Sequence, residues 1–474
     1  MSPSLLILAI ILYSFACWLG LYLLARNPSA PQLRYAGLGI LAYAFSLGTD
    51  LLATYAPTPA LSMTFTRLHW PLLFLPAFFW FVAILYLLPG DSSWHPHQAK
   101  LWSQGIILLA VPFYLFSAGT NLIFDFSTTP PQAGPAYLLF AAAVLLPMGV
   151  ALILIGKMYR TATLQKPFGL ILVVTIFFGL SAGLLVYPLQ WIPRIWLLFA
   201  ISLDFALLGV TIAWLDAFEE GESLLPDMAR AFDSALFAVS LFGGLVLVTI
   251  WLSTGLTFSM LALLLGTITA AIGSQILADP LQSLIDRMAL AAFPRLRQER
   301  AELRAIATAL PRAQEPLAAE FLDETKFSRL TRRALSHLGD LPRLATSPLT
   351  HLPLIDHRLA RRQARDDTLE RAAELKSLLT DSILRLKPRD KGDFGTTEEW
   401  RYYNALYFPY VAGLKPYSRR GDYTDHGLEA AEKEAFDWLR TYVPERTLYN
   451  WQNAAAKLVA QDLRERLKIT NGHE

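Results

Sequence analysis

The sequence contains few charged residues and almost no cysteine. Charged residues make up 17% of its 474 residues, and hydrophobic residues make up 54%. A soluble domain carries about 25% charged residues, so a large part of this chain is expected to lie in lipid. The single cysteine, Cys17, excludes both a disulfide framework and a metal site built from cysteines.

Sequence motifs that hold nucleotides or catalytic zinc are also missing. The chain has no Gly-x-x-x-x-Gly-Lys loop and no His-Glu-x-x-His helix. We therefore predict no catalytic residue, no cofactor and no metal site, and we do not expect the chain to be an enzyme.

The charged residues that are present concentrate after residue 280. Of the 41 Lys and Arg residues, 9 precede residue 281 and 32 follow it; of the 39 Asp and Glu residues, 11 precede it and 28 follow it. The first part is therefore predicted to be a membrane domain and the remainder a soluble domain. The soluble part carries a net charge of +4, which is too small to indicate nucleic-acid binding by itself.

Nine apolar runs are long enough to cross a hydrocarbon core of about 30 Å, which takes about 20 helical residues. Each run must be a helix, because unpaired backbone groups are not tolerated in lipid. Only Ser253, Thr254 and Gly255 separate the last two runs, which are expected to form a tight hairpin. The runs lie near residues 4–25, 35–56, 68–88, 102–123, 136–157, 167–187, 194–215, 234–254 and 256–278.

Basic residues in the short loops orient the bundle, because Lys and Arg accumulate on the cytoplasmic side. With the N-terminus outside, the inner loops hold seven basic residues and the outer loops hold two. Five further arginines lie between residues 285 and 304, after the ninth run. The sequence therefore predicts a multi-pass protein of the inner (plasma) membrane with a cytoplasmic C-terminal domain.

The residues after the ninth run show helical periodicity and no alternating strand pattern. The predicted fold class is therefore all-α: a polytopic bundle of about nine spans plus a C-terminal all-α cytoplasmic domain. We expect a juxtamembrane helical linker over residues 281–316 and an output domain over residues 317–474. Helices are expected in the output domain at 317–338, 368–387, 428–442 and 446–468, the last two forming a helix-turn-helix-like end over 428–468.

Four ionisable residues in or beside the spans are candidates for a ligand or signal site, because charge inside a bilayer is costly. Asp204 lies near the middle of the seventh predicted span, and Asp50 lies in the outer half of the second. Arg67 and His69 are expected at the outer mouth of the third span, where they could pair with Asp50. The alternative is that these residues serve only as structural pairs between helices.

The C-terminal stretch EKEAFDWLRTYVPERTLYNWQNAAAKLVAQDLRERL predicts two helices joined by a short turn. It resembles the helix-turn-helix of phage-type and sigma-like regulators, whose second helix reads base edges with its N-terminal residues. The resemblance implies that Thr447, Asn450 and Gln452 face base edges. It also implies that Arg446 and Lys457 meet phosphates. The alternative is a plain helical hairpin.

Ser336 and His337, followed by Pro342, loosely resemble the phosphoacceptor box of sensor histidine kinases. In those kinases an acidic residue follows the histidine, whereas this chain has Leu338. No Asp-x-Gly-x-Gly or Gly-x-Gly box for ATP follows. We therefore interpret His337 as a partly exposed helix residue.

The opening stretch CWLGLYLLARNPSAPQLRYAGLGILAYAFSLGTDLL resembles the N-terminal seven-span sensor region of bacterial histidine kinases, over residues 1–216. Residues 217–280 add two further spans that form the hairpin, and the kinase domain is absent. The resemblance implies that the membrane region senses a ligand or a membrane state and passes the signal to a cytoplasmic output domain.

We therefore expect a membrane-anchored sensor, or a signal-transducing or transcriptional regulatory protein, without catalytic activity. Its expected partners are the lipid bilayer, a small-molecule or membrane-state signal, and either DNA or a cytoplasmic regulatory protein, with a homodimer as the candidate assembly. The alternatives are a small-solute transporter or channel component, and a membrane scaffold with a protein-binding tail.

Overall fold

The computed structural model divides the chain into two compact units. Unit 1 comprises residues 1–216 and 228–288, and unit 2 comprises residues 217–227 and 289–474. The residues that the structure describes are 3–28, 30–87, 96–127, 131–161, 165–186, 194–220, 224–253, 255–290, 293, 295–296, 300, 304, 324–388, 392–414, 416–417 and 429–471.

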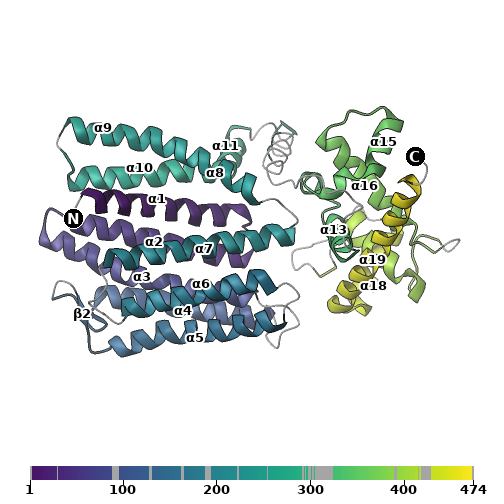
Figure 1. The fold of residues 1–474 in the computed structure, drawn as a ribbon. Coiled ribbons are helices and arrows are strands. Elements are labelled where there is room, and N and C mark those ends of the chain that lie inside the picture. Colours follow the sequence, from purple (N-terminus) through teal and green to yellow (C-terminus); the bar gives the residue numbers. More distant parts are fainter. Residues whose placement is uncertain are drawn as a thin grey trace. The chain divides into compact units, whose positions relative to one another are not determined.

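Unit 1 is a bundle of long helices (Figure 1). Each of the nine predicted apolar runs overlaps one helix, and α8 and α9 form a single span joined by the π-helical turn η1. The elements are α1 (Pro3–Arg26), α2 (Pro31–Thr54), α3 (Pro59–Leu87), α4 (Pro96–Gly119), α5 (Tyr137–Thr161), α6 (Gln165–Val186), α7 (Arg194–Glu220), α8 (Leu224–Ala238), η1 (Val239–Gly243), α9 (Gly244–Leu252), α10 (Phe258–Ile276) and α11 (Ala278–Ala289).

Within the described part of the chain, seven helices are long and apolar enough to cross a membrane. They are α1 to α5, the continuous α8–α9 helix, and α10. Helices α6 and α7 are 22 and 27 residues long, and their described apolar stretches are Gly169–Leu180 and Phe199–Trp214. This set of long apolar helices is compatible with a multi-pass membrane protein.

Helix α3 begins earlier than hydropathy predicts. It starts at Pro59, and the hydroxyl of Thr58 accepts a hydrogen bond of 3.3 Å from the amide of Leu61. A proline at the first helical position and a threonine cap before it start a helix without requiring apolar residues. Arg67 and His69 therefore lie within the helix, eight and ten residues after its start.

Glycines let α1 and α2 pack closely. A Cβ atom at Gly20 would lie 3.0 Å from the carbonyl oxygen of Gly37, and a Cβ at Gly37 would lie 2.8 Å from the carbonyl oxygen of Gly20. Small residues at such contacts let two backbones approach each other, which is the usual basis of packing between membrane helices.

Hydroxyl groups link helices that are far apart in the sequence. The hydroxyls of Tyr13 on α1 and Thr269 on α10 lie 2.6 Å apart, and those of Tyr43 on α2 and Ser202 on α7 lie 2.9 Å apart. Helix α10 runs beside α1 (Figure 1). The first span of the bundle is therefore a neighbour of the last one described.

The predicted all-α class is confirmed in the described residues, apart from one short two-stranded antiparallel ladder. It pairs β1 (Phe124–Asp125) with β2 (Gln132–Ala133), with Phe124 opposite Ala133. Strands of two residues are too short to show an alternating hydrophobic pattern, so they were not predicted. Phe124 is buried and its ring centroid lies 5.0 Å from that of Phe140 on α5, which anchors the connection between α4 and α5.

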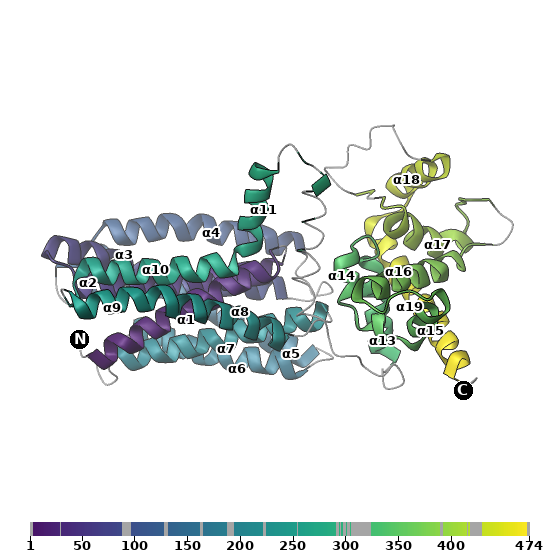
Figure 2. The same cartoon turned by 90° about the horizontal axis from the view of Figure 1, so that it is seen from above.

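Unit 2 is helical in the residues described (Figure 2). The predicted helices at 368–387, 428–442 and 446–468 are confirmed; of the one predicted at 317–338, α13 covers the later part and residues 317–323 lie outside the described residues. The elements are α13 (Glu324–Ser336), α14 (Leu341–Ala345), η4 (Pro348–His351), α15 (Pro353–Arg362), α16 (Thr368–Leu384), η5 (Glu398–Trp400), α17 (Arg401–Leu406), η6 (Tyr407–Val411), α18 (Ala430–Tyr442) and α19 (Glu445–Asn471).

Helix α19 organises the core of unit 2. It packs against α13, α15, α16 and α17. Leu448, Ala455, Val459 and Leu463 are buried along one side of it, at the three- and four-residue spacing of a core-facing helix.

Candidate functional site

The structure brings two of the four predicted intramembrane residues together. Nε2 of His69 lies 3.8 Å from Oδ1 of Asp50, and the side chains are 1% and 35% exposed. Ser46, one turn before Asp50 on α2, contacts the other side of the imidazole. Its carbonyl oxygen lies 2.9 Å from Nδ1 of His69, and its hydroxyl donates to the carbonyl oxygen of His69 at 3.3 Å.

Two tautomers of the His69 ring fit these contacts. Nδ1–H can donate to the carbonyl oxygen of Ser46, or an unprotonated Nδ1 can accept from the Ser46 hydroxyl, which also lies 2.9 Å away. In the second case Nε2–H faces the carboxylate of Asp50. The contacts among Ser46, Asp50 and His69 thus form a candidate polar site that links α2 to α3.

Arg67 contacts other groups than the predicted Asp50. Its guanidinium donates to the carbonyl oxygen of Ala118 at 3.2 Å and to Oδ1 of Asn121 at 2.7 Å, and it lies 4.8 Å from the ring centroid of Phe126. Residues two apart on a helix point about 200° apart around its axis, so Arg67 and His69 cannot reach the same partner. Arg67 therefore ties α3 to the connection that follows α4.

Asp204 is buried on α7. It is 7% exposed and lies two residues after Ser202, whose hydroxyl contacts that of Tyr43 on α2. Residues two apart point about 200° apart around a helix axis, so the contact between Ser202 and Tyr43 does not place Asp204 beside α2. The role of Asp204 in a ligand or signal site stays a prediction.

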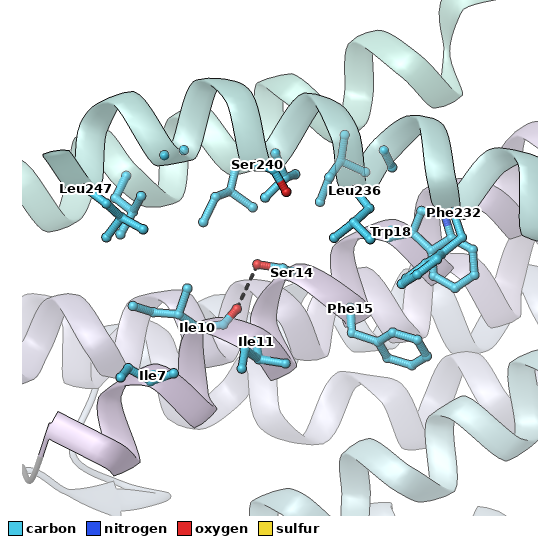
Figure 3. Close-up of a pocket in the computed structure, with 17 residues that line it drawn as sticks. Ile7, Ile10, Ile11, Ser14, Phe15, Trp18, Phe232, Leu236, Ser240 and Leu247 are labelled. Carbon is cyan, nitrogen blue, oxygen red and sulfur yellow. Dashed lines mark hydrogen bonds between the residues drawn. The ribbon is translucent and has the colours of Figure 1, made fainter.

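An apolar cavity of about 440 Å³ lies between α1, the α8–α9 helix and α10 (Figure 3). Aliphatic and aromatic side chains form most of its wall. They include Ile7, Ile11 and Phe15 from α1, Phe232, Leu236 and Leu247 from α8 and α9, and Ile268 and Ile272 from α10.

The π turn η1 forms one wall of this cavity. Val239, Ser240 and Gly243 of the turn line it, together with the adjacent Gly244. A Cβ at Gly244 would meet no atom within 4 Å, so the glycine leaves space that a side chain would fill. A π turn inserted into an α-helix is frequently found at a functional site.

The lining suits a ligand that is mostly hydrocarbon. Ser14 on α1 and Ser240 on η1 bring hydroxyl-bearing side chains from opposite walls (Figure 3). The hydroxyl of Ser14 donates to the carbonyl oxygen of Ile10 at 2.8 Å, which leaves its oxygen able to accept a hydrogen bond. Small-molecule sites of about 300–1,000 Å³ with apolar walls and few polar groups bind compact ligands and orient them through those groups.

The predicted DNA-binding residues divide into two groups on α19. Arg446, Asn450 and Lys457 are exposed, and Thr447 is half-buried. Gln452 points into unit 2, where its amide donates to the carbonyl oxygen of Ala405 at 3.3 Å. Gln452 would have to break this hydrogen bond before it could contact a base. The role of all five side chains in DNA recognition stays a prediction.

The turn before α19 is held by aromatic side chains. Only Val443 and Pro444 separate α18 from α19, a slightly shorter turn than the predicted helix bounds of 442 and 446 leave. The rings of Trp438 and Trp451 stack across it with centroids 6.1 Å apart, and the hydroxyl of Tyr417 donates to the carbonyl oxygens of Leu439 and Val443. The helix pair is thereby fixed in one geometry.

His337 lies just after the end of α13, between two arginines. Burial, together with the positive charges of Arg333 and Arg343, lowers its pKa from 6.5 to about 4, although the nearby Asp340 acts in the opposite direction. Its imidazole is therefore neutral at physiological pH. In the described part of the chain, no group of three or more His, Cys, Asp or Glu side chains is placed to hold a metal ion.

Sequence analysis missed the cavity, because its walls are apolar residues like those of every other span. One signal was present: the segment VSLFGG places a serine and two adjacent glycines within an otherwise large and apolar run. Serine and glycine pairs are a known cause of irregular helix geometry.

Comparison with known proteins found no match: no family model, no curated protein and no solved structure matches this chain.

Proposed function

We propose that this chain is a membrane-anchored sensor. In this proposal, the cavity between α1, α8–α9 and α10 binds a lipid-soluble molecule with an aliphatic body, and the bundle relays its presence to unit 2. The observation that supports the proposal is the cavity's position on the last hairpin. Helix α10 lines the cavity and is followed, after Leu277 alone, by α11 and then by unit 2.

The π turn is the element that a ligand would bias. A ligand shifts a conformational equilibrium only if it interacts differently with the two states. A π turn and a regular α-helical turn place the following residues at different rotations about the helix axis. A ligand that contacts Ser240 and Gly243 would therefore favour one rotation of α9, and α9 packs against α10.

We further propose that the chain crosses a bacterial inner membrane nine times, with its N-terminus outside and unit 2 in the cytoplasm. The seven helices that meet the length and hydropathy criteria support this count, as do the lengths of α6 and α7. The concentration of basic residues in alternate loops supports the orientation.

A photoreactive fatty acid tests the cavity. Purified protein in nanodiscs is irradiated with a diazirine-bearing palmitic acid, and the labelled peptides are mapped by mass spectrometry. We expect labelling of peptides from α1 and α8–α9, and we expect unlabelled palmitic acid to compete. Gly244→Leu should reduce this labelling at least tenfold, because the leucine side chain fills the cavity.

Gly266→Leu is the matched control. Gly266 lies on α10, is exposed, and has no atom within 4 Å of a Cβ built on it, yet it does not line the cavity. This variant should be labelled like the unmodified protein. Equal labelling of the Gly244→Leu and Gly266→Leu variants would refute the cavity as a ligand site.

The exposed side of α19 is the proposed output surface, and DNA binding is its specific form to test. Binding of the intact chain in nanodiscs to pooled genomic DNA is measured by mobility shift at several salt concentrations. Phosphate contacts should give a log–log salt slope of about −0.9 per contact. Lys457→Ala should flatten this slope, whereas Asn450→Ala should relax sequence preference by roughly 1–3 kcal/mol. A folded chain that shifts no DNA at low salt would exclude DNA as the output partner.

A further inference from the structure

Helix α11 has its apolar residues on one side. Leu281, Leu284, Ile285 and Met288 follow the spacing i, i+3, i+4 and i+7. At 100° per residue they fall within an arc of about 100° around the helix axis, which is the width of an amphipathic stripe. Gln282, Ser283, Asp286 and Arg287 occupy the rest of the circumference.

This stripe faces away from the protein. Leu281, Leu284, Ile285 and Met288 are 45%, 54%, 60% and 77% exposed. Asp286, on the opposite side, is only 4% exposed and is engaged with other groups. Ser283 is half-buried, whereas Gln282 and Arg287 are exposed. The helix thus contacts the protein near Asp286 while its apolar side is uncovered, the reverse of a helix that packs onto a soluble core.

The position of α11 indicates what covers the stripe. A single residue, Leu277, separates it from α10, which is a candidate membrane span. Figure 2 shows α11 turned away from the direction of α10. A helix that starts where a span leaves the hydrocarbon core is in reach of the bilayer interface, and an amphipathic helix lying in that plane buries its apolar side in the acyl boundary.

We propose that α11 is an interfacial helix whose Leu281–Leu284–Ile285–Met288 stripe lies on the lipid bilayer. The occupant of the stripe is the acyl region of the leaflet into which α10 opens. Arg287, which lies outside the apolar arc and is exposed, is placed to contact lipid phosphates. The proposal does not depend on the ligand cavity, because it uses none of the residues that line it.

Fluorescence quenching of two single-cysteine labels tests this inference. Met288→Cys and Gln282→Cys variants of the full chain are labelled with NBD and placed in nanodiscs. The native Cys17 is fully buried, so the introduced thiol is the reactive one. Residues 288 and 282 point about 120° apart on the helix, so one label should enter lipid and the other water.

We expect doxyl-labelled lipid to quench the label at 288 at least threefold more than the label at 282. Aqueous iodide should show the opposite order. Equal quenching of both labels by iodide, with none by doxyl lipid, would overturn the proposal, because α11 would then lie in water. Protection of the label at 288 from both quenchers would also overturn it, since a protein surface or a second copy would then cover the stripe.

Discussion

At the scale of single residues, the surroundings of His337 determine its protonation state. The same Ser-His pair that resembles a phosphoacceptor box lies partly buried between Arg333 and Arg343. The pKa of His337 is 6.5 in the unfolded chain and about 4 in the folded chain. Between these two pH values, the unfolded chain therefore binds a proton at His337 more readily than the folded chain does. The contribution of His337 to the free energy of unfolding should therefore fall as pH decreases from about 6.5 to about 4.

Replacing His337 tests this dependence. In His337→Gln, the part of the pH dependence that lies between the ordinary pKa of 6.5 and the lowered pKa of about 4 should disappear. Urea unfolding of residues 289–474, followed by circular dichroism at several pH values, measures it. Ser336→Ala, at the exposed neighbouring position, should retain the full slope. A slope that persists unchanged in His337→Gln would contradict the assignment.

The sequence identified the ionisable residues of the bundle but not their partners. Asp50 and His69 were placed near the same end of neighbouring spans, and in the structure their side chains lie 3.8 Å apart. Arg67 was expected to join them, but it contacts Asn121, a residue in a connection whose path hydropathy does not reveal. Partner choice depends on rotation about the helix axis, which a span prediction leaves undetermined.

At the scale of secondary-structure elements, an ion-pair cluster holds α15 against α16. Glu374 on α16 is 3% exposed at its side chain and pairs with Arg358 and Arg362 on α15. Arg358 also pairs with Asp381, and its guanidinium donates to the hydroxyl of Ser377 at 3.2 Å. The carboxylate is buried while both arginines reach solvent, so the two sides of the cluster are not equivalent.

This asymmetry predicts different costs for different substitutions. Arg358→Met combined with Arg362→Met leaves Glu374 buried without compensation, which should cost roughly 3–5 kcal/mol of unfolding free energy. Adding Glu374→Leu to these two substitutions should recover most of the lost unfolding free energy, because no buried charge remains. Urea unfolding of the same fragment measures both variants. If the triple variant is no more stable than the double one, the burial of Glu374 is not what sets the cost.

Element boundaries were predicted well where hydropathy dominates and poorly elsewhere. The ends of α1 and α10 follow the apolar runs closely, because the lipid requirement fixes them. The early start of α3 at Pro59 and the π turn at Val239–Gly243 were not predicted. Both arise from local backbone chemistry inside or beside an apolar run, where average hydropathy carries no information.

At the scale of the whole molecule, the proposed topology has a direct test. Reporter fusions after residue 130 and after residue 290 should report opposite sides of the membrane, outside and inside respectively. The physical reason is the unequal distribution of Lys and Arg between alternate loops. Alkaline phosphatase and green fluorescent protein fusions give complementary readouts. Signals from the same side at both positions would refute the nine-span arrangement.

The hydrogen bond between Tyr13 and Thr269 sets a condition on biosynthesis. The two residues are 256 positions apart, so the first span is inserted long before its partner helix exists. At roughly 5–20 residues per second, the wait lasts about 10–50 s. During that time the hydroxyl of Tyr13 must find a temporary acceptor in α1 itself, in lipid headgroups or in the insertion machinery. A ribosome that stalls before α10 would therefore release a bundle whose first helix is incompletely covered and open to membrane quality control.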